Sequence, residues 1–522
     1  MKASLSDDSP LLIVQVDQPT VENTGDLYYR TYAPGIGMAH CDGIYTLNFN
    51  NVHRSKYELM GMADVLILNN ICDADILPVI RDRKTTGKLT IYELSDDLWE
   101  IPPSNPFRGY YSHSNNLLLT KRLASYCDAF QFSSHELHKK FGYLNGVCAV
   151  FPNHMLEIPP ERKKKPSGVV TVGWGGSSGH LQDMERISVP LIDWIMSTEN
   201  VCLHLMCDDL IWAIFDKLPR DRIKRSAPGS LQDYYRFVSQ LDIGLAPLED
   251  IAFNRSRSDI KFLEYAAHSV VPVVQAMGPY LMSVQHGKTG FLFRSTDELI
   301  SIVDKLASDV SIRTEVGAAA RKYVLRERNQ IEHGRDRVEF YRGLPAAAGW
   351  NLEPKGNKAE ELFRALCNCA GVKKTGRNLS LRETRYESLL RCGLSALQFD
   401  KSSARAMFQE AIQINPEIYT PYLFGAFVHD DTVGFLKNAV QKNPRSIVAW
   451  IFLGVVYGCK HMTSEAIESF KTASRIFPEY EQPYIECANF LNKIGRKREG
   501  IALMKQALRV IPDQIRNAAG SL

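Results

Sequence analysis

The chain has 522 residues, and its 45% hydrophobic and 23% charged content is that of an ordinary globular protein, which excludes a mostly disordered chain. Its formal net charge of +3 gives no basic field for nucleic acid. The eleven cysteines include no Cys-x-x-Cys pair, which favours a reducing compartment over a disulfide framework or a structural zinc site. No apolar run reaches the roughly 18 residues of a membrane span, and the start of the chain lacks the basic and long apolar regions of a secretory signal. We expect a cytoplasmic protein of three or four domains.

Residues 1–160 alternate short apolar runs with helical stretches, which is the pattern of a parallel α/β domain. Predicted strands lie at 11–16, 65–68 and 89–93. The charged segment 161–168 (ERKKKPSG) has no apolar periodicity and predicts a linker. Its lysine run could instead contact anionic lipid, which leaves peripheral membrane contact as an alternative.

A second α/β domain is predicted over residues 166–343. Its first segment, 169–183, reads VVTVGWGGSSGHLQD: a buried strand, then glycines and serines, then a helix. Backbone N–H groups of Gly175, Gly176 and Ser177 at the start of that helix would suit a phosphate group. The alternative is a tight turn that binds nothing.

The same glycines also approximate a dinucleotide fingerprint. Asp208 and Asp209 follow the next predicted strand, where an oxidoreductase would place a carboxylate on the ribose. The glycine spacing is weakly specific and lies in the second domain instead of the first, so this alternative is less favoured.

The segment 253–274 (FNRSRSDIKFLEYAAHSVVPVV) predicts a helix that begins near Ser258. Arg257, Lys261 and Glu264 fall on one face of it, and an apolar face lies opposite. Two cations and a carboxylate in this order are either a solvated stripe or part of a binding site.

Several polar residues of the first domain are further candidates. Asp96 and Asp97 follow a predicted strand at its carboxyl end, where ligands bind in α/β folds. One of them could act as a general base, or both could cap the next helix or form salt links. Arg30 lies after the first strand, near Gly25, Gly35 and Gly37, in a loop that could contact a substrate. The pair Asp73-x-Asp75 imitates a metal-binding motif, but we interpret it as a chance occurrence and expect no metal.

After a predicted linker at 344–378, prolines recur every 34 residues, at Pro444, Pro478 and Pro512. The intervening residues resemble the tetratricopeptide pattern, with Trp450, Leu453, Gly454, Tyr457, Ala466, Phe470 and Ala473 in order. Residues 379–522 are therefore predicted to be an all-α solenoid, which usually binds another molecule. The side chains expected in its groove, among them Val448, Ile451 and Val455, would contact a partner, pack on the other domains or pair two subunits.

The second domain resembles the carboxyl-terminal nucleotide-sugar domain of GT-B-fold glycosyltransferases, most closely the retaining family four. The similarity lies in the stretch LDIGLAPL … FNRSRSDIKFLEYAAHSVVPVV … GKTGFLF, with matching residues Lys261, Glu264, Pro272, Val273, Val274, Gly287, Thr289 and Gly290. The first domain is similar in IYELSDDLWEIPPSNP, CDAFQFSSHELHKKFG and VFPNHM. The resemblance spans roughly residues 11–340.

This resemblance implies two Rossmann-like domains and transfer of a sugar from a nucleotide-sugar to a protein or surface-polysaccharide acceptor. Transfer would retain the anomeric configuration and would use the nucleotide-sugar as co-substrate, with no other cofactor and no metal. Glu264 would hold the ribose of the donor. Lys261 and Arg257 would neutralise the leaving diphosphate, and the backbone of the glycine turn would donate to the same phosphates.

On the acceptor side we expect Asp96, Asp97 and Arg30, from their positions after predicted strands of the first domain, with Asp97 as the catalytic carboxylate. One departure favours other interpretations: Ser256 stands where the family has a carboxylate, eight residues before Glu264. A catalytically silent scaffold that works through its solenoid is the main alternative, and an isomerase of nucleotide-sugars is another.

Overall fold

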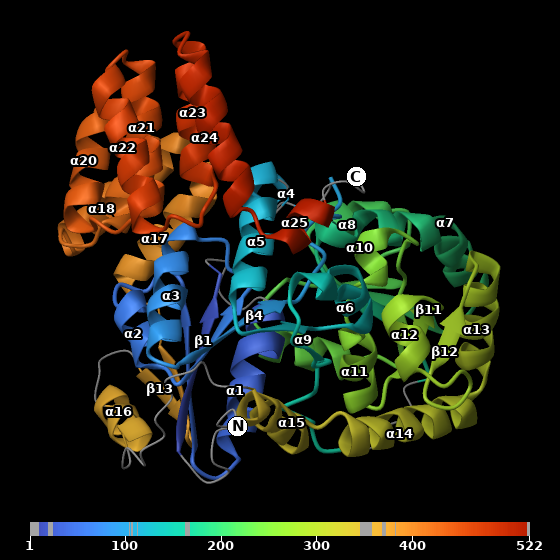
Figure 1. Ribbon diagram of the computed structural model, residues 1–522. Coiled ribbons are helices and arrows are strands. Elements are labelled where there is room, and N and C mark those ends of the chain that lie inside the picture. Colours follow the sequence, from blue (N-terminus) through green and yellow to red (C-terminus); the bar gives the residue numbers. More distant parts are fainter. Residues whose placement is uncertain are drawn as a thin grey trace.

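The computed structural model describes residues 10–18, 25–103, 105, 108–111, 113–161, 168–344, 358–367, 372–381 and 383–518. The chain forms two α/β domains with largely parallel sheets, followed by a stack of helix pairs, which confirms the predicted fold class (Figure 1). The predicted linker at 161–168 falls mostly on residues 162–167, which lie outside the described residues together with their lysine run.

The first domain is built on an eight-stranded sheet in the order β13-β14-β2-β1-β3-β4-β5-β6. Its strands are β1 (Leu11–Asp17), β2 (Ile44–Asn50), β3 (Val65–Asn69), β4 (Leu89–Leu94), β5 (Ala129–Phe132), β6 (Cys148–Val150), β13 (Val372–Thr375) and β14 (Asn378–Leu381). Its helices are η1 (Leu27–Tyr32, a π-helix), α1 (Ala33–Ala39), α2 (Lys56–Met62), η2 (Ala74–Ile76), α3 (Leu77–Thr85), α4 (Arg108–Tyr111), α5 (Ser114–Tyr126), α6 (His135–Phe141) and η3 (Gly142–Leu144).

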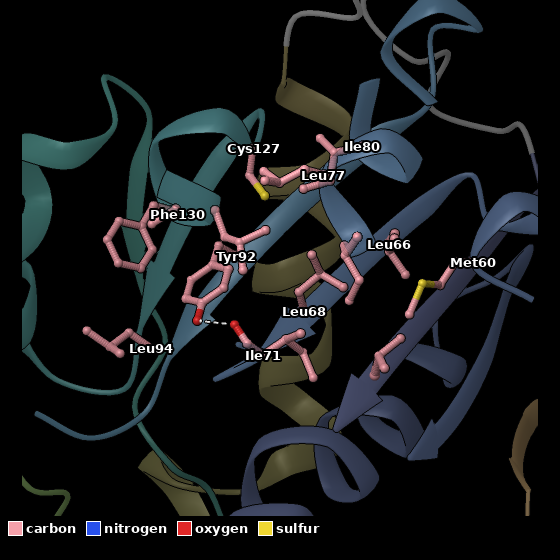
Figure 2. Close-up of a cluster of buried hydrophobic side chains, with 14 of the residues drawn as sticks. Met60, Leu66, Leu68, Ile71, Leu77, Ile80, Tyr92, Leu94, Cys127 and Phe130 are labelled. Atoms are coloured by element: carbon pink, nitrogen blue, oxygen red, sulfur yellow. Dashed lines mark hydrogen bonds between the residues drawn. The ribbon is translucent and has the colours of Figure 1, made fainter. Parts of the chain in front are cut away.

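The central strands of this sheet are buried along their whole length, because helices cover both faces. Figure 2 shows part of the resulting core, in which side chains of β3 and β4 pack against α2 and α3. The Tyr92 hydroxyl lies inside this core and donates to the Ile71 carbonyl at 2.8 Å, so its burial leaves that donor satisfied.

The second domain has a six-stranded parallel sheet in the order β12-β11-β10-β7-β8-β9. Its strands are β7 (Val170–Gly175), β8 (Val201–Met206), β9 (Ile223–Ser226), β10 (Ile243–Ala246), β11 (Val271–Gln275) and β12 (Phe291–Phe293). Its helices are η4 (Ser178–His180), α7 (Leu181–Ser197), α8 (Asp209–Ile214), α9 (Leu231–Val238), α10 (Ala252–Arg255), α11 (Ile260–Ala267), α12 (Gly278–Ser283), α13 (Thr296–Ser308) and α14 (Val310–Glu327).

The structure corrects two of the predicted domain boundaries. Helix α15 (Gln330–Gly343), which we expected in the second domain, packs on α1 of the first (Figure 1). Part of the predicted linker 344–378 also folds: it contains α16 (Lys358–Cys367) and β13, and the β13–β14 hairpin joins the first sheet beside β2. The strands of this hairpin are too short for an apolar period to stand out, although Leu379 is fully buried.

The predicted solenoid 379–522 begins with part of β14, and all of its regular elements in the described residues after 382 are helices. Its helices are α17 (Arg385–Ala396), α18 (Lys401–Ile414), α19 (Thr420–Gly425), α20 (Thr432–Lys442), α21 (Ile447–Cys459), α22 (Thr463–Ile476), α23 (Gln482–Lys493), α24 (Lys497–Val510) and α25 (Asp513–Ala518). Residues of the repeat pattern lie where paired helices meet: a Cβ at Gly454 would lie 2.8 Å from the Phe470 ring, so the small residue permits close packing.

The solenoid docks on the first domain through Asp75, which is 4% exposed. The carboxylate of Asp75 accepts hydrogen bonds from the Tyr419 hydroxyl at 2.9 Å, the Ser446 hydroxyl at 2.6 Å and the Val448 backbone N–H at 3.1 Å. The motif that resembled a metal pair therefore joins two parts of the chain.

A buried ion pair also lies in this interface. The Arg122 guanidinium lies 3.2 Å from the Glu481 carboxylate, and both side chains are almost fully enclosed. Val448 and Ile451 pack against the core of the first domain, so part of the expected groove is filled by the chain itself. Val455 remains 37% exposed.

Helices α1 and α15 pack against each other at Gly37 and Gly334. A Cβ at Gly334 would lie 2.1 Å from the Gly37 carbonyl carbon, whereas a Cβ at Gly343, on the same helix, would meet nothing within 4 Å. We expect Gly334→Ala to lower the free energy of unfolding by about 1–3 kcal/mol, because the helices must separate. Gly343→Ala should leave it unchanged or slightly raised. Denaturant unfolding of both variants measures this, and equal stability would contradict the packing described.

Candidate functional site

Lys261 lies at the carboxyl end of the second sheet. Its ammonium donates to the Gly175 carbonyl, where β7 ends, and to the Tyr234 hydroxyl at 3.0 Å. Burial lowers the pKa of Lys261, while the nearby carboxylate of Glu264 opposes that shift. Helix α11 thus presents a cation at the strand ends, the position at which α/β folds bind ligands.

Glu264 lies one turn further along α11 and is 5% exposed. One oxygen of its carboxylate accepts from Tyr234 at 2.9 Å, and the other accepts from Tyr29 of the first domain at 2.8 Å. Burial raises the pKa of Glu264, and the Lys261 charge and the two hydroxyls oppose the shift. Neither tyrosine could be assigned to the site from sequence, because their hydroxyls come from separate helices.

Arg257 precedes α11, which begins at Ile260, within two residues of the predicted start. Its guanidinium nevertheless lies close enough to Lys261 to lower the pKa of that ammonium. Arg257 contacts His180 Nε2 at 3.0 Å, and His180 Nδ1 lies 2.7 Å from Asp183. Since arginine can only donate, His180 accepts at Nε2 and donates from Nδ1.

Burial and the charge of Arg257 lower the pKa of His180 to about 4, so this imidazole is neutral near pH 7. A neutral His180 orients the guanidinium without competing with it for an anion. The site therefore offers two cations, Arg257 and Lys261, close to one carboxylate.

The glycine turn differs from the predicted phosphate cradle. The Gly176 N–H donates to the Met206 carbonyl at 3.0 Å, and the Ser178 N–H donates to the Asp208 carboxylate at 2.5 Å. Gly175 is the last residue of β7 and pairs with β8, and Ser177 precedes the short turn η4 instead of a long helix. Of the three predicted backbone donors, the Gly176 N–H is therefore hydrogen-bonded within the fold, whereas Ser177 is exposed.

The hydrogen bonds of Asp208 argue against the dinucleotide-binding alternative, in which this carboxylate would hold a ribose. Its carboxylate caps α8 by accepting from the Ile211 N–H at 3.2 Å, in addition to the Ser178 N–H. This side chain is therefore committed to helix capping.

A pocket of about 430 Å³ lies at the carboxyl ends of β8 and β9, beside the glycine turn. It is lined by Met206, Ser226, Ala227, Pro228, Gly229, Asp233, Arg236, Phe237 and Gln240. A larger cavity, about 1130 Å³, includes Val169, Asp242 and Ser269 at the opposite ends of the strands. The smaller pocket meets the glycine turn at Met206, whose carbonyl accepts from the Gly176 N–H, and sequence reasoning did not identify it.

Asp96 comes from the loop after β4 of the first domain and is partly buried. Burial raises its pKa to about 6, the positive charge of Arg257 opposes the shift, and Asp26 and Asp97 add to it. Since Arg257 belongs to the second domain, Asp96 is the candidate carboxylate of the first domain that lies within electrostatic reach of the site.

Asp97 and Arg30 have structural partners instead. The Asp97 carboxylate accepts from the Trp99 N–H at 3.2 Å and from Lys140 at 2.7 Å, which is the capping and salt-link interpretation. Arg30 is 2% exposed and lies 2.5 Å from the Glu93 carboxylate. Both side chains thus have structural partners, and the catalytic role expected of Asp97 and the acceptor contact expected of Arg30 stay predictions. Gly35 and Gly37 lie inside α1 and not in a loop.

Among the described residues, no three His, Cys, Asp or Glu side chains gather in a way that could hold a metal ion. Nor does any described helix combine the length and apolar character needed to cross a membrane.

Comparisons with known proteins find similarity in solved structures alone, since no family model and no curated protein matches the chain. HepE of Anabaena, in complex with UDP-glucose, is 15% identical over 63% of this chain and 98% of its own, with a TM-score of 0.48. A glycosyltransferase from Rickettsia africae is 14% identical over 64% and 98%, with a TM-score of 0.45. The sucrose-phosphate synthase of Thermosynechococcus elongatus is 12% identical over 64% and 98%, also at 0.45. Similarity at this level does not assign an activity.

The raised pKa of Asp96 predicts a pH dependence of stability. The folded protein keeps a proton that the unfolded chain releases, so this stabilisation is complete below about pH 4 and is lost as the pH rises through about 6. Replacing Asp96 by Asn removes that decline, and the variant should be more stable than the native protein above pH 6 by up to roughly 2 kcal/mol.

Denaturant unfolding between about pH 4 and pH 8 measures this difference. Glu100→Gln is the matched control, because it removes an exposed carboxylate from the same loop. Parallel profiles for the native protein and Asp96→Asn would show that Asp96 is not buried as described.

Proposed function

We propose that the protein is a glycosyltransferase that moves a sugar from a nucleotide-sugar to an acceptor. The observation that carries the proposal is the meeting of Lys261, Arg257 and the buried Glu264 at the carboxyl end of the second sheet. These are the residue types, in the positions, that the resemblance to GT-B-fold glycosyltransferases assigns to donor binding.

The two cations supply the main catalytic contribution in this proposal. Breaking the anomeric C–O bond develops negative charge on the leaving diphosphate, and fixed cations stabilise that charge without the need for a metal ion. Arg257 is held by His180 and Lys261 by Tyr234, so little reorganisation is required when the charge forms. Ser177 remains a candidate backbone donor to the same phosphates.

The nucleoside would lie beside these cations. Glu264 has lone pairs for the ribose hydroxyls, since each of its oxygens accepts one tyrosine hydroxyl and can accept another donor. The pocket beside the glycine turn, with Met206 and Phe237 in its wall, would take the base.

The acceptor would approach from the first domain, near Asp96. Retention of configuration, as the resemblance implies, brings the acceptor hydroxyl to the leaving-group side, where Arg257 also lies. Asp96 would accept a hydrogen bond from that hydroxyl. We infer a protein or surface polysaccharide as the acceptor and the cytoplasm as the compartment, with the exposed faces of the solenoid free for a protein partner.

A catalytically silent scaffold is the second candidate, and Ser256 is the observation that favours it. Ser256 is 4% exposed, and its carbonyl accepts from Ser134 of the first domain at 2.7 Å. It therefore lacks the carboxylate of the family, and its carbonyl already accepts one hydrogen bond from the first domain.

Release of nucleotide from UDP-, GDP-, dTDP- and ADP-sugars tests the proposal. We expect turnover of one donor, a loss of about 100-fold or more in Lys261→Met, and binding of the parent nucleotide weakened at least about tenfold in Glu264→Gln. Lys288→Met, which removes an exposed cation from the same domain, should behave like the native protein. If no nucleotide binds and the substitutions change nothing, the scaffold is the better description.

A further inference from the structure

Tyr29 connects the first domain to the candidate nucleoside site. It lies on η1, a π-helix, which is a rare element that often occurs at functional sites. Its ring is 4% exposed and packs in an apolar cluster formed largely by the second domain, with Met206, Tyr235 and Leu263 among the members. The edge-on contact with Tyr28, at 4.9 Å between ring centroids, fixes the ring from its own helix.

The hydroxyl of Tyr29 forms two hydrogen bonds of defined direction. It lies 2.8 Å from Glu264 Oε1 and 2.9 Å from the Tyr235 hydroxyl. An ionised carboxylate can only accept, so Tyr29 donates to Glu264 and accepts from Tyr235. Tyr234 donates to the other carboxylate oxygen at 2.9 Å.

The Glu264 carboxylate is therefore fixed by one tyrosine of its own domain and by one of the other domain. Each carboxylate oxygen has about two acceptor positions. One tyrosine on each oxygen leaves one position on each, and two neighbouring ribose hydroxyls need that same number.

We propose that Tyr29 is a positioning residue for the nucleoside. Its hydroxyl holds the Glu264 carboxylate in the orientation that receives the ribose, and this orientation depends on contact between the two domains. The inference rests on the proposed function, which assigns the ribose to Glu264. It adds that the nucleoside site is complete only when the first domain is in place.

Tyr29→Phe separates the two contributions of this side chain, because it keeps the buried ring and removes the hydroxyl. A hydrogen bond to a charged group contributes more free energy than one between neutral groups. Loss of the bond from Tyr29 to Glu264 should therefore lower the affinity for a nucleoside diphosphate about tenfold or more. The affinity for pyrophosphate, which has no ribose, should stay within about twofold of the native value.

The experiment is isothermal titration of the full-length chain with UDP, GDP, dTDP, ADP and pyrophosphate. Tyr32→Phe is the matched control: it removes a hydroxyl from the same helix at a ring that contacts Tyr28 and Lys373 of the first domain. This control should bind every probe like the native protein. A thermal unfolding curve of each variant shows whether the fold is retained.

The outcomes are distinct. If the native protein binds none of the four nucleotides, the proposed function fails and this inference fails with it. If the native protein binds one of them and Tyr29→Phe binds it equally well, the proposed function stands and the role of Tyr29 is refuted. A parallel loss of pyrophosphate binding also refutes it, because the substitution would then act on the whole site and not on the ribose.

Discussion

One buried carboxylate, that of Glu93 on β4, joins the helix that follows the second α/β domain to the first domain. It is fully enclosed and lies 2.5 Å from Arg30 and 3.2 Å from Arg337 of helix α15. Burial alone would raise the pKa of Glu93, yet the two arginines outweigh it and hold the pKa below its usual value. Loss of the Glu93 carboxylate would leave both buried guanidinium groups without their shared counter-charge, at a cost of about 3–5 kcal/mol. Because α15 follows the second domain in the chain, this cluster ties the end of that domain to the first.

The candidate site follows from this arrangement, since it draws on both domains. Arg257, Lys261 and Glu264 come from the second, whereas Tyr29 and Asp96 come from the first. The hydrogen bond from Tyr29 to Glu264 and the electrostatic effect of Arg257 on Asp96 both cross the domain boundary. A change in the relative position of the domains would therefore alter both of these contacts together.

The solenoid packs on the first domain through several specific contacts. Asp75 and the Arg122–Glu481 pair fix it to the first domain, and the β13–β14 hairpin, which precedes it, extends that domain's sheet. These contacts leave the helical region at a fixed orientation to the first domain, on the side of the molecule away from most of the second (Figure 1). A partner held by the solenoid would thus be presented in a defined direction.

The sequence by itself determined the two α/β units, the helical region and the position of Lys261 and Glu264, because these depend on local periodicity and on motifs within single segments. It did not determine the roles of Asp96 and Asp97. Two adjacent carboxylates look alike in sequence. Lys140, 43 residues away in the chain, forms a salt link with Asp97 and not with Asp96, and the sequence alone does not show this pairing. The tyrosines on Glu264, the return of α15 and the edge hairpin were decided by tertiary structure alone. Each of them joins segments that are distant in the chain. The free energy of such contacts depends on how the segments pack together, which the local sequence pattern does not indicate.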